Sequence, residues 1–406
     1  MNIGFYFGPK IDSDPKSGGG FTFAMSIFQE LCKTSTDHNI YIFSEDAEKF
    51  YDNKDINIKF IKINRYYASE KENLLKKTIL KLPRKILRFI QDKKYKNALN
   101  KSVLENKIDL MWFATPAFEF VVVPYVYTVW DLQHRKQTYF PELVINSEFE
   151  NREKSYNSII PKAAFVITGN KAGKNDICKF YNYPEERVIE ISLPVPNFVF
   201  NNIVTSNECI DIKKPFIFYP AQFWAHKNHI IILLAIKNLK EKYNLDFNVV
   251  FTGSDKGNLN YIKEKVKEFG LEKKIKFLGF VPIEDIIYFY KNAFALVFPS
   301  FFGPDNIPPL EAFALNCPVI TARVEGVQYQ LQDAVLLFDP KNELELVENI
   351  KKLYEDNNLK NNLIKNGKEL VEKYKTQEYI KKIFKVIDDF ERILRCWSSK
   401  DIYKHL

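Results

Sequence analysis

The chain has 406 residues, of which 46% are hydrophobic and 27% charged, and its formal net charge is +8. This composition is typical of a folded soluble protein and excludes an intrinsically disordered one, and the length favours two domains of roughly 200 residues each. The longest apolar stretch, residues 118–130, is interrupted by Glu119 and Pro124. A membrane-spanning helix requires about 20 apolar residues, so no transmembrane segment is expected.

The amino terminus and the cysteines both favour a cytoplasmic location. Residues 1–8 (MNIGFYFG) run directly into a predicted strand and show no basic region followed by an apolar one, so no secretory signal is expected. The five cysteines are scattered and form no CxxC pair, which predicts neither a disulfide framework nor a zinc cluster. His226 and His229 lie close in sequence, but no cysteine or acidic cluster accompanies them, and we expect no bound metal.

In the first half of the chain, strand-like apolar runs alternate with segments of helical spacing. The runs lie at residues 3–8, 40–44, 56–63, 108–114, 126–131 and 165–168. After the first run, SGGGFTFA (residues 17–24) places Gly18, Gly19 and Gly20 before a helix, which is a favourable position for a phosphate or an acceptor group. The spacing differs from GxGxxG, so the dinucleotide-dehydrogenase fingerprint is not met.

Residues 71–101 account for the whole excess of positive charge. They contain eleven Lys or Arg residues against Glu72 and Asp92. Apolar residues recur among them at intervals of three and four, which predicts an amphipathic helix, or two helices broken at Pro83. Two interpretations stay open: a solvated basic helix packed on its own domain, or a helix that docks on an anionic membrane surface. Nucleic acid is not an expected partner, because aromatic residues are not interleaved with the charges.

The second half repeats the alternation. A polar linker is predicted at residues 201–214, and further strands at residues 216–221, 247–253, 275–280, 295–300, 317–322 and 334–339. Alternating strands and helices predict an α/β fold with two Rossmann-like, doubly wound parallel-sheet domains that face each other across a cleft. We expect an N-terminal domain at residues 1–200, a C-terminal domain at residues 215–385, and a last helix within residues 386–406 that packs back toward the N-terminal domain.

Two motifs of the second half follow predicted strands and are candidates for ligand binding. In YPAQFWAHKNH (residues 219–229), Lys227 stands at a helix entrance where its ammonium group could meet a phosphate, although a surface lysine would look the same. In FLGFVP (residues 277–282), the exposed backbone at Gly279, with Phe280 and Val281, could receive a nucleobase.

FFGPDNIPPLEAFALNCPVI (residues 301–320) is the most informative stretch. A Gly- and Pro-rich turn leads into a helix that starts near Pro308, and proline is favoured at the first helical position. The N–H groups and dipole of such a helix start attract anions, so a phosphate is predicted over residues 307–310 (Ile307, Pro308 and Leu310 among them). Glu311 would then accept hydrogen bonds from ligand hydroxyls. An ordinary β–α connection with a favourable charge at the helix start is the alternative.

Together, these stretches resemble the retaining glycosyltransferases of family 4, the group 1 transferases, over nearly the whole chain. The likeness is strongest from residue 216 to residue 340, where PAQFWAHKN, TGS (residues 252–254, with Gly253), FLGFV, PPLEAFALNCPVI and QDAVLLFDP occur in the family's order. The resemblance implies a B-type glycosyltransferase fold and transfer of a sugar from a nucleotide-sugar with retention of configuration, without a catalytic metal or other cofactor. Asp12-Ser13-Asp14 spells the DxD metal motif of the other major glycosyltransferase fold, but we interpret it as a polar loop.

The resemblance carries over unevenly to single residues. Glu311 matches the family's second paired glutamate, which binds ribose hydroxyls, whereas Gly303 stands in place of the first. Asp305 and Asn306 are therefore expected to approach the donor sugar. Four further positions correspond to family residues. Gln222 stands in place of the phosphate-binding arginine, and Lys227 matches the phosphate-binding lysine. Trp130 stands in place of the histidine of a histidine–aspartate pair, and Asp131 matches its aspartate.

The resemblance thus implies a cytoplasmic hexosyltransferase, either free or peripheral on the inner membrane. It would use a UDP- or GDP-sugar and a saccharide or lipid-linked saccharide acceptor in bacterial surface polysaccharide synthesis. Lys227, Glu311 and Asp131 are the candidate catalytic residues. Two alternatives stay open: a nucleotide-sugar 2-epimerase of the same shape, and a non-catalytic partner subunit, which the departures at Gly303, Gln222 and Trp130 would favour.

Overall fold

The computed structural model describes residues 1–8, 19–46, 58–63, 84–201, 212–303 and 305–398, with the backbone alone at 84–92, 94 and 95. In the N-terminal domain a seven-stranded parallel sheet has the order β3-β2-β1-β4-β5-β6-β7. Its strands are β1 (Asn2–Tyr6), β2 (Asn39–Ser44), β3 (Ile58–Lys62), β4 (Leu110–Phe113), β5 (Tyr125–Thr128), β6 (Phe165–Thr168) and β7 (Val188–Glu190). The helices between them are α1 (Gly19–Leu31), α3 (Arg84–Glu105), α4 (Gln133–Lys136), α5 (Glu148–Ile159) and α6 (Lys171–Tyr181).

The C-terminal domain holds a six-stranded parallel sheet of order β10-β9-β8-β11-β12-β13. Its strands are β8 (Phe216–Pro220), β9 (Asn248–Thr252), β10 (Ile275–Phe277), β11 (Ala295–Phe298), β12 (Val319–Ala322) and β13 (Val335–Phe338). Its helices are α7 (His229–Tyr243), α8 (Leu259–Glu268), α9 (Ile283–Asn292), α10 (Ile307–Ala314), α11 (Val327–Leu331), α12 (Glu343–Glu355) and α13 (Asn357–Val371), and the chain ends its described helices with α14 (Thr376–Leu394). Short 3-10 helices include η4 (Pro141–Leu143), which contains Glu142, and η9 (Ala225–Lys227), which ends at Lys227.

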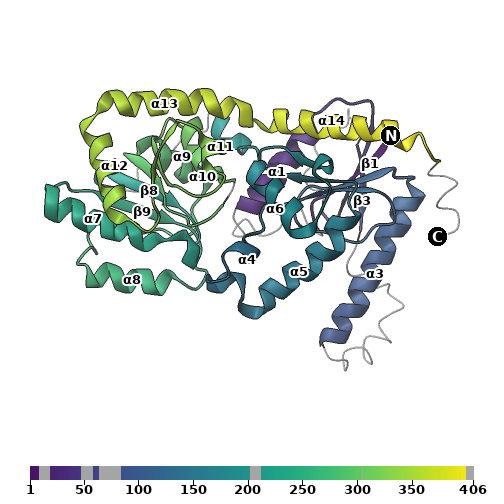
Figure 1. The fold of residues 1–406 in the computed structure, drawn as a ribbon, viewed down its shortest axis with the longest axis horizontal. Coiled ribbons are helices and arrows are strands. Elements are labelled where there is room, and N and C mark those ends of the chain that lie inside the picture. The colour runs from purple at the N-terminus through teal and green to yellow at the C-terminus, as the bar shows by residue number, and fades with distance from the viewer. Residues whose placement is uncertain (9–18, 47–57, 64–83, 202–211, 304, 399–406) are drawn as a thin grey trace.

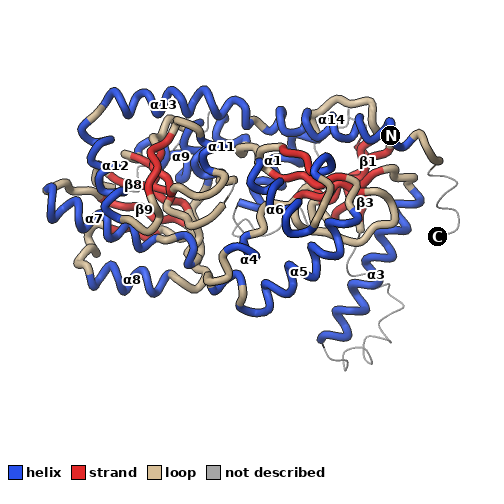
Figure 2. Tube along the Cα trace, in the orientation of Figure 1, coloured by secondary structure: helices blue, strands red, loops and turns tan. Residues whose placement is uncertain are grey.

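Both sheets are covered by helices on their two faces, as Figures 1 and 2 show. Every residue of β4, β5, β11 and β12 is buried, which explains why these strands read as continuous apolar runs rather than as alternating ones. The predicted fold class is confirmed, and each of the twelve predicted runs contains a strand. The short edge strand β7 was not predicted, because three residues of mixed burial give too little pattern.

The last helix, α14, lies against the N-terminal domain (Figure 1). Its buried residues join the core around β1 and β4; for example, the rings of Phe384 and Tyr379 lie 6.4 Å from Phe5 and 6.2 Å from Trp112. Where the chain crosses between domains, Val195 N–H donates to the carbonyl of Tyr374 at 2.8 Å. The helix begins at Thr376, so the predicted boundary at residue 385 falls inside it.

The basic segment, residues 71–101, is described only in part, because residues 71–83 lie outside the described ranges. The DxD sequence at residues 12–14 also lies outside them. Helix α3 begins at Arg84, directly after Pro83, and projects beyond the N-terminal sheet in Figure 1. Leu99 and Val103 anchor its C-terminal part in the core. In the part of the chain that the structure describes, no helix has the length and apolar character needed to cross a membrane.

Candidate functional site

A cleft of about 830 Å³ lies between the two domains and is lined by residues of both. It collects most of the residues that the sequence singles out: Gly19, Gly20, Asp131, Gln222, Lys227, Gly253, Gly279, Phe280, Val281, Asp305, Asn306, Ile307, Pro308 and Glu311. Leu310 is instead fully buried in the C-terminal core, and Gly18 lies outside the described residues. The residues predicted to bind ligands therefore line a single cleft, except Leu310, which packs in the core of the C-terminal domain.

The parallel topology explains this convergence, because the carboxyl ends of β8, β9, β10 and β11 meet at one edge of the sheet. Gly253 joins two of the loops there: its N–H donates to the carbonyl of Gly279 at 2.7 Å. Gly253 has φ +131°, and a Cβ at this position would stand 2.4 Å from the carbonyl oxygen of Ala221. Glycine is therefore required for the close approach of the β8 and β9 loops.

Lys227 ends the single turn η9 after β8 and reaches the cleft. Burial lowers the pKa of its ammonium group to about 8, opposed by the nearby carboxylates of Asp131 and Glu142. The ammonium lies 5.3 Å from the centre of the Phe298 ring, and Tyr219 OH fixes the backbone by donating to the Lys227 carbonyl at 2.9 Å. Lys227 is thus a partly desolvated cation that an incoming anion would stabilise.

This lowered pKa predicts how anion binding depends on pH. As pH rises through about 8, the Lys227 ammonium loses its proton in the unliganded protein, so a diphosphate ligand should bind about tenfold more weakly at pH 9 than at pH 7. Calorimetry with UDP across this range checks the prediction. In Lys227→Arg the cation keeps its charge, so the affinity should stay constant; an equal fall in both proteins would contradict the assignment.

Glu311 lies in the second turn of α10 and faces the cleft. Its Oε2 accepts a hydrogen bond from Tyr290 OH at 2.8 Å, and the same hydroxyl lies 3.2 Å from the carbonyl of Pro308. Burial raises the pKa of Glu311 to about 7, and the Tyr290 hydrogen bond opposes this shift. A buried carboxylate with one bound hydroxyl has acceptor capacity left for the hydroxyls of a ligand.

The first turn of α10 offers fewer free N–H groups than the predicted phosphate site over residues 307–310 requires. Pro308 and Pro309 carry none, and the N–H of Asn306 donates to Gln330 Oε1 at 2.9 Å. An anion at this helix start would therefore meet the N–H of Ile307 and the helix dipole, rather than a row of amides from residue 307 to residue 310. Lys227 consequently carries a larger share of any phosphate binding.

The two residues expected to contact the donor sugar, Asp305 and Asn306, line the cleft, but both side chains are packed against protein groups. Asn306 Nδ2 donates to the carbonyl of Gly303 at 2.6 Å. The Asp305 carboxylate occupies the space where a Cβ of Gly169 would stand, so it is packed against the N-terminal domain. Neither carboxylate oxygen of Asp305 has a hydrogen-bond partner among the described residues. Burial raises the pKa of Asp305 to about 7, and the neighbouring Asn170 opposes this shift.

The opposite wall of the cleft contains a residue that sequence reasoning missed, Arg152. Its guanidinium lies 3.4 Å from Asp131 Oδ1 and 2.6 Å from Glu148 Oε1. Asp131 Oδ1 also accepts from the N–H of Gln133 at 2.9 Å. The spacing of four residues between Glu148 and Arg152 is a common helical pair, and nothing in the sequence marks it as part of a site.

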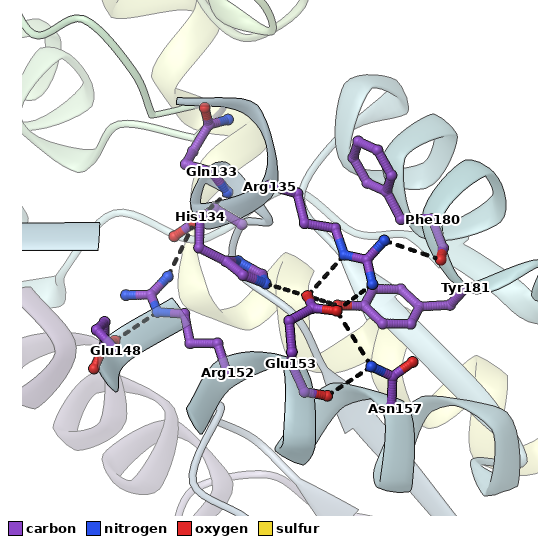
Figure 3. Close-up of polar contacts among 10 residues, drawn as sticks. Gln133, His134, Arg135, Glu148, Arg152, Glu153, Asn157, Phe180 and Tyr181 are labelled. Carbon is purple, nitrogen blue, oxygen red and sulfur yellow. Dashed lines mark hydrogen bonds and ion pairs between the residues drawn. The ribbon is translucent and has the colours of Figure 1, made fainter. Parts of the chain in front are cut away.

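A partly buried network of hydrogen bonds holds α4 on α5 next to this wall (Figure 3). Glu153 Oε1 accepts from His134 Nε2 and Arg135 Nε, each at 2.7 Å, and lies 3.2 Å from Tyr181 OH. Although burial acts to raise it, the pKa of Glu153 is lowered to about 2 by the hydrogen bonds from Arg135 and His134. The network fixes the segment that follows Asp131 and so keeps the wall rigid.

Trp130 closes the end of the cleft near α1. A Cβ on Gly20 would approach Cη2 of this tryptophan to 3.1 Å, and Phe23 packs edge-on against its ring at 5.6 Å.

The two histidines that lie close in sequence, His226 and His229, have different partners: His226 contacts Glu142, whereas His229 stacks on Phe223 with ring centres 4.3 Å apart. Within the described ranges, no three His, Cys, Asp or Glu side chains are grouped so that they could hold a metal ion.

Residues 206–370 match the family described as "Glycosyl transferases group 1". The C-terminal domain belongs to the group 1 glycosyltransferases. The O-antigen chain mannosyltransferase B of Escherichia coli is 24% identical over 49% of this chain and 54% of its own length. The chain thus spans about half the length of the curated relatives it matches. The motifs that resemble group 1 in the sequence lie within residues 206–370, the part that the family matches.

The whole chain has the B-type glycosyltransferase fold. Sucrose-phosphate synthase from Thermosynechococcus elongatus superposes with a TM-score of 0.72 at 16% identity, covering 97% of this chain and 100% of that one. Anabaena HepE in complex with UDP-glucose gives a TM-score of 0.65 at 16% identity, covering 96% and 100%. At these identities the likeness establishes the fold, and the group 1 assignment rests on the C-terminal domain.

Proposed function

We propose that this protein is a retaining, metal-independent glycosyltransferase that moves a hexose-type sugar from a UDP- or GDP-sugar to a saccharide acceptor. One observation carries the proposal: the cleft places Lys227, Ile307 and Glu311 of the group 1 domain opposite Asp131 and Arg152 of the N-terminal domain. A cation and a backbone donor on one side suit a nucleoside diphosphate. The Asp131 carboxylate on the other side suits the hydroxyls of a sugar.

On the donor side, Glu311 would accept hydrogen bonds from the ribose hydroxyls, and the backbone at Gly279 and Val281 would receive the base. Phe280 is 54% exposed at the rim of the cleft, which leaves its ring available to the nucleotide. The HepE complex with UDP-glucose, which shares the fold, supports a nucleotide-sugar as the donor class.

In the reaction, negative charge develops on the diphosphate as its bond to the sugar breaks. Lys227 and the N–H of Ile307 would stabilise this charge from fixed positions, which is generally the dominant contribution of a protein to such a step. The acceptor hydroxyl then forms the new bond on the same face of the sugar, and its proton passes to the departing phosphate. Asp131, oriented by Arg152 and the N–H of Gln133, would hold the acceptor.

The acceptor is proposed to be a saccharide, lipid-linked or free, in bacterial surface polysaccharide synthesis. The similarity to an O-antigen chain mannosyltransferase supports this pathway. The basic residues 71–101 would then place the cytoplasmic N-terminal domain against the inner membrane surface, where a lipid-linked acceptor resides.

The purified chain, incubated with a panel of UDP- and GDP-sugars and an oligosaccharide mixture, should release nucleoside diphosphate and form a glycoside only when an acceptor is present. Mass spectrometry identifies the product, and NMR of the new anomeric centre establishes whether configuration is retained. Release of a free epimerised sugar without an acceptor would support a 2-epimerase instead. Failure of every nucleotide to raise the thermal stability of the chain would support a non-catalytic partner subunit.

A further inference from the structure

Glu142 belongs to the N-terminal domain, yet its side chain binds the turn of the C-terminal domain that carries Lys227. The Glu142 side chain is 7% exposed. Its Oε1 accepts two hydrogen bonds from His226, one from the backbone N–H at 2.9 Å and one from Nδ1 at 2.5 Å. One carboxylate oxygen therefore fixes both the main chain and the ring of the residue that precedes Lys227.

The protonation states of this pair are well defined near neutral pH. Burial lowers the pKa of His226 to about 4, so its imidazole is neutral and Nδ1–H donates to the carboxylate. Burial acts to raise the pKa of Glu142, but the hydrogen bonds from His226 prevail and the pKa is lowered, so the carboxylate is ionised. The contact should therefore persist at neutral pH, well above the pKa of His226.

The rest of the His226 ring is enclosed by aromatic side chains from both domains. It stacks on Phe302 with ring centres 3.9 Å apart and an interplanar angle of 16°. Phe140, two residues before Glu142, lies 6.1 Å from the His226 ring and 5.4 Å from Phe301. The ring is thus held between the N-terminal segment and the loop that leads to α10.

Further contacts seat the same N-terminal segment, residues 136–142, on the C-terminal domain. Gln137 Nε2 donates to the carbonyl of Phe301 at 3.3 Å, and Lys136 forms an ion pair with Glu325. The segment begins at Lys136, the last residue of α4, and α4 itself follows Asp131, which lines the acceptor wall of the cleft. It therefore connects that wall directly to the η9 turn.

We propose that Glu142 is a positioning residue that acts across the domain interface, holding the η9 turn so that the Lys227 ammonium faces the donor diphosphate. The donor site would then be complete only when the N-terminal segment is seated on the C-terminal domain, although the nucleotide itself contacts the C-terminal domain. This inference rests on the proposed function of the cleft as a nucleotide-sugar site.

A double-mutant cycle with UDP, or with GDP if that nucleotide binds more tightly, tests the proposal. Glu142→Gln keeps the shape of the side chain but removes its charge and the strong acceptor for His226. We expect it to weaken nucleotide binding about tenfold, because Lys227 loses its fixed position and a nearby opposite charge. In the Lys227→Ala background the same substitution should change the affinity less than twofold, since the group it positions is missing.

Glu150→Gln is the matched control, because Glu150 is an exposed carboxylate of the same domain. The Glu150→Gln variant should bind the nucleotide with the same affinity as the parental chain. Thermal unfolding confirms that each variant is folded. An equal loss from Glu142→Gln in both backgrounds, or no loss in either, would overturn the positioning role alone. Absence of UDP and GDP binding in the parental chain would overturn the proposed function, and this inference with it.

Discussion

Replacing Lys227 by alanine should slow sugar transfer by about 10²- to 10³-fold, the range found when one preorganised donor to a developing anion is removed. The structure supports a large effect, because Pro308 and Pro309 leave few backbone N–H groups at the start of α10. Lys227 is therefore the principal cation on the donor side of the cleft among the described residues. The rate of nucleoside diphosphate release with saturating donor and acceptor measures the effect.

Lys240→Ala is a suitable control for this substitution, because Lys240 is an exposed lysine of α7 outside the cleft. It should leave the transfer rate at the parental value. The assignment of Lys227 fails if its alanine variant transfers sugar as fast as the control while remaining folded.

Replacing Glu311 by alanine should weaken binding of UDP or GDP by about 10- to 100-fold. The expected loss corresponds to about 1.5–3 kcal/mol for hydrogen bonds that ribose hydroxyls donate to a charged acceptor, measured above the raised pKa of Glu311 of about 7. Tyr290 OH should keep its contact with the carbonyl of Pro308, so the helix start should stay intact. Calorimetry with the ribonucleotide and with its 2′-deoxy form distinguishes a hydroxyl contact from a general disturbance.

The parental chain should prefer the ribonucleotide, and Glu311→Ala should bind the two forms almost equally. Glu284→Ala, an exposed carboxylate of α9, should keep the parental preference. A Glu311→Ala variant that loses affinity for both forms but keeps the preference between them would contradict the ribose role.

The sequence predicts the two-domain architecture well, because each buried parallel strand is an apolar run between helical segments. Lys227 and Glu311 could be placed at one edge of the sheet for the same reason: both follow the carboxyl ends of neighbouring strands. Pro308 and Pro309 lack N–H groups by residue type, so the sequence itself indicates that phosphate contacts fall mainly on Lys227.

The interdomain parts of the site could not be predicted in this way. Glu142 and His226 are 84 residues apart, and their contact depends on how the two domains dock rather than on any local pattern. The same holds for Asp305, whose carboxylate packs against Gly169. Arg152 lies on an ordinary polar helix, and its place in the cleft follows from the packing of α5 beside α4.

The central claim is that a nucleoside diphosphate lies between Lys227 and the start of α10. A crystal structure of the parental chain with UDP or GDP tests it most directly. We predict diphosphate oxygens within hydrogen-bonding distance of Lys227 Nζ and of the Ile307 N–H, with the ribose hydroxyls on Glu311. A nucleotide bound elsewhere, or a diphosphate in the cleft with Lys227 turned away from it, would contradict the account.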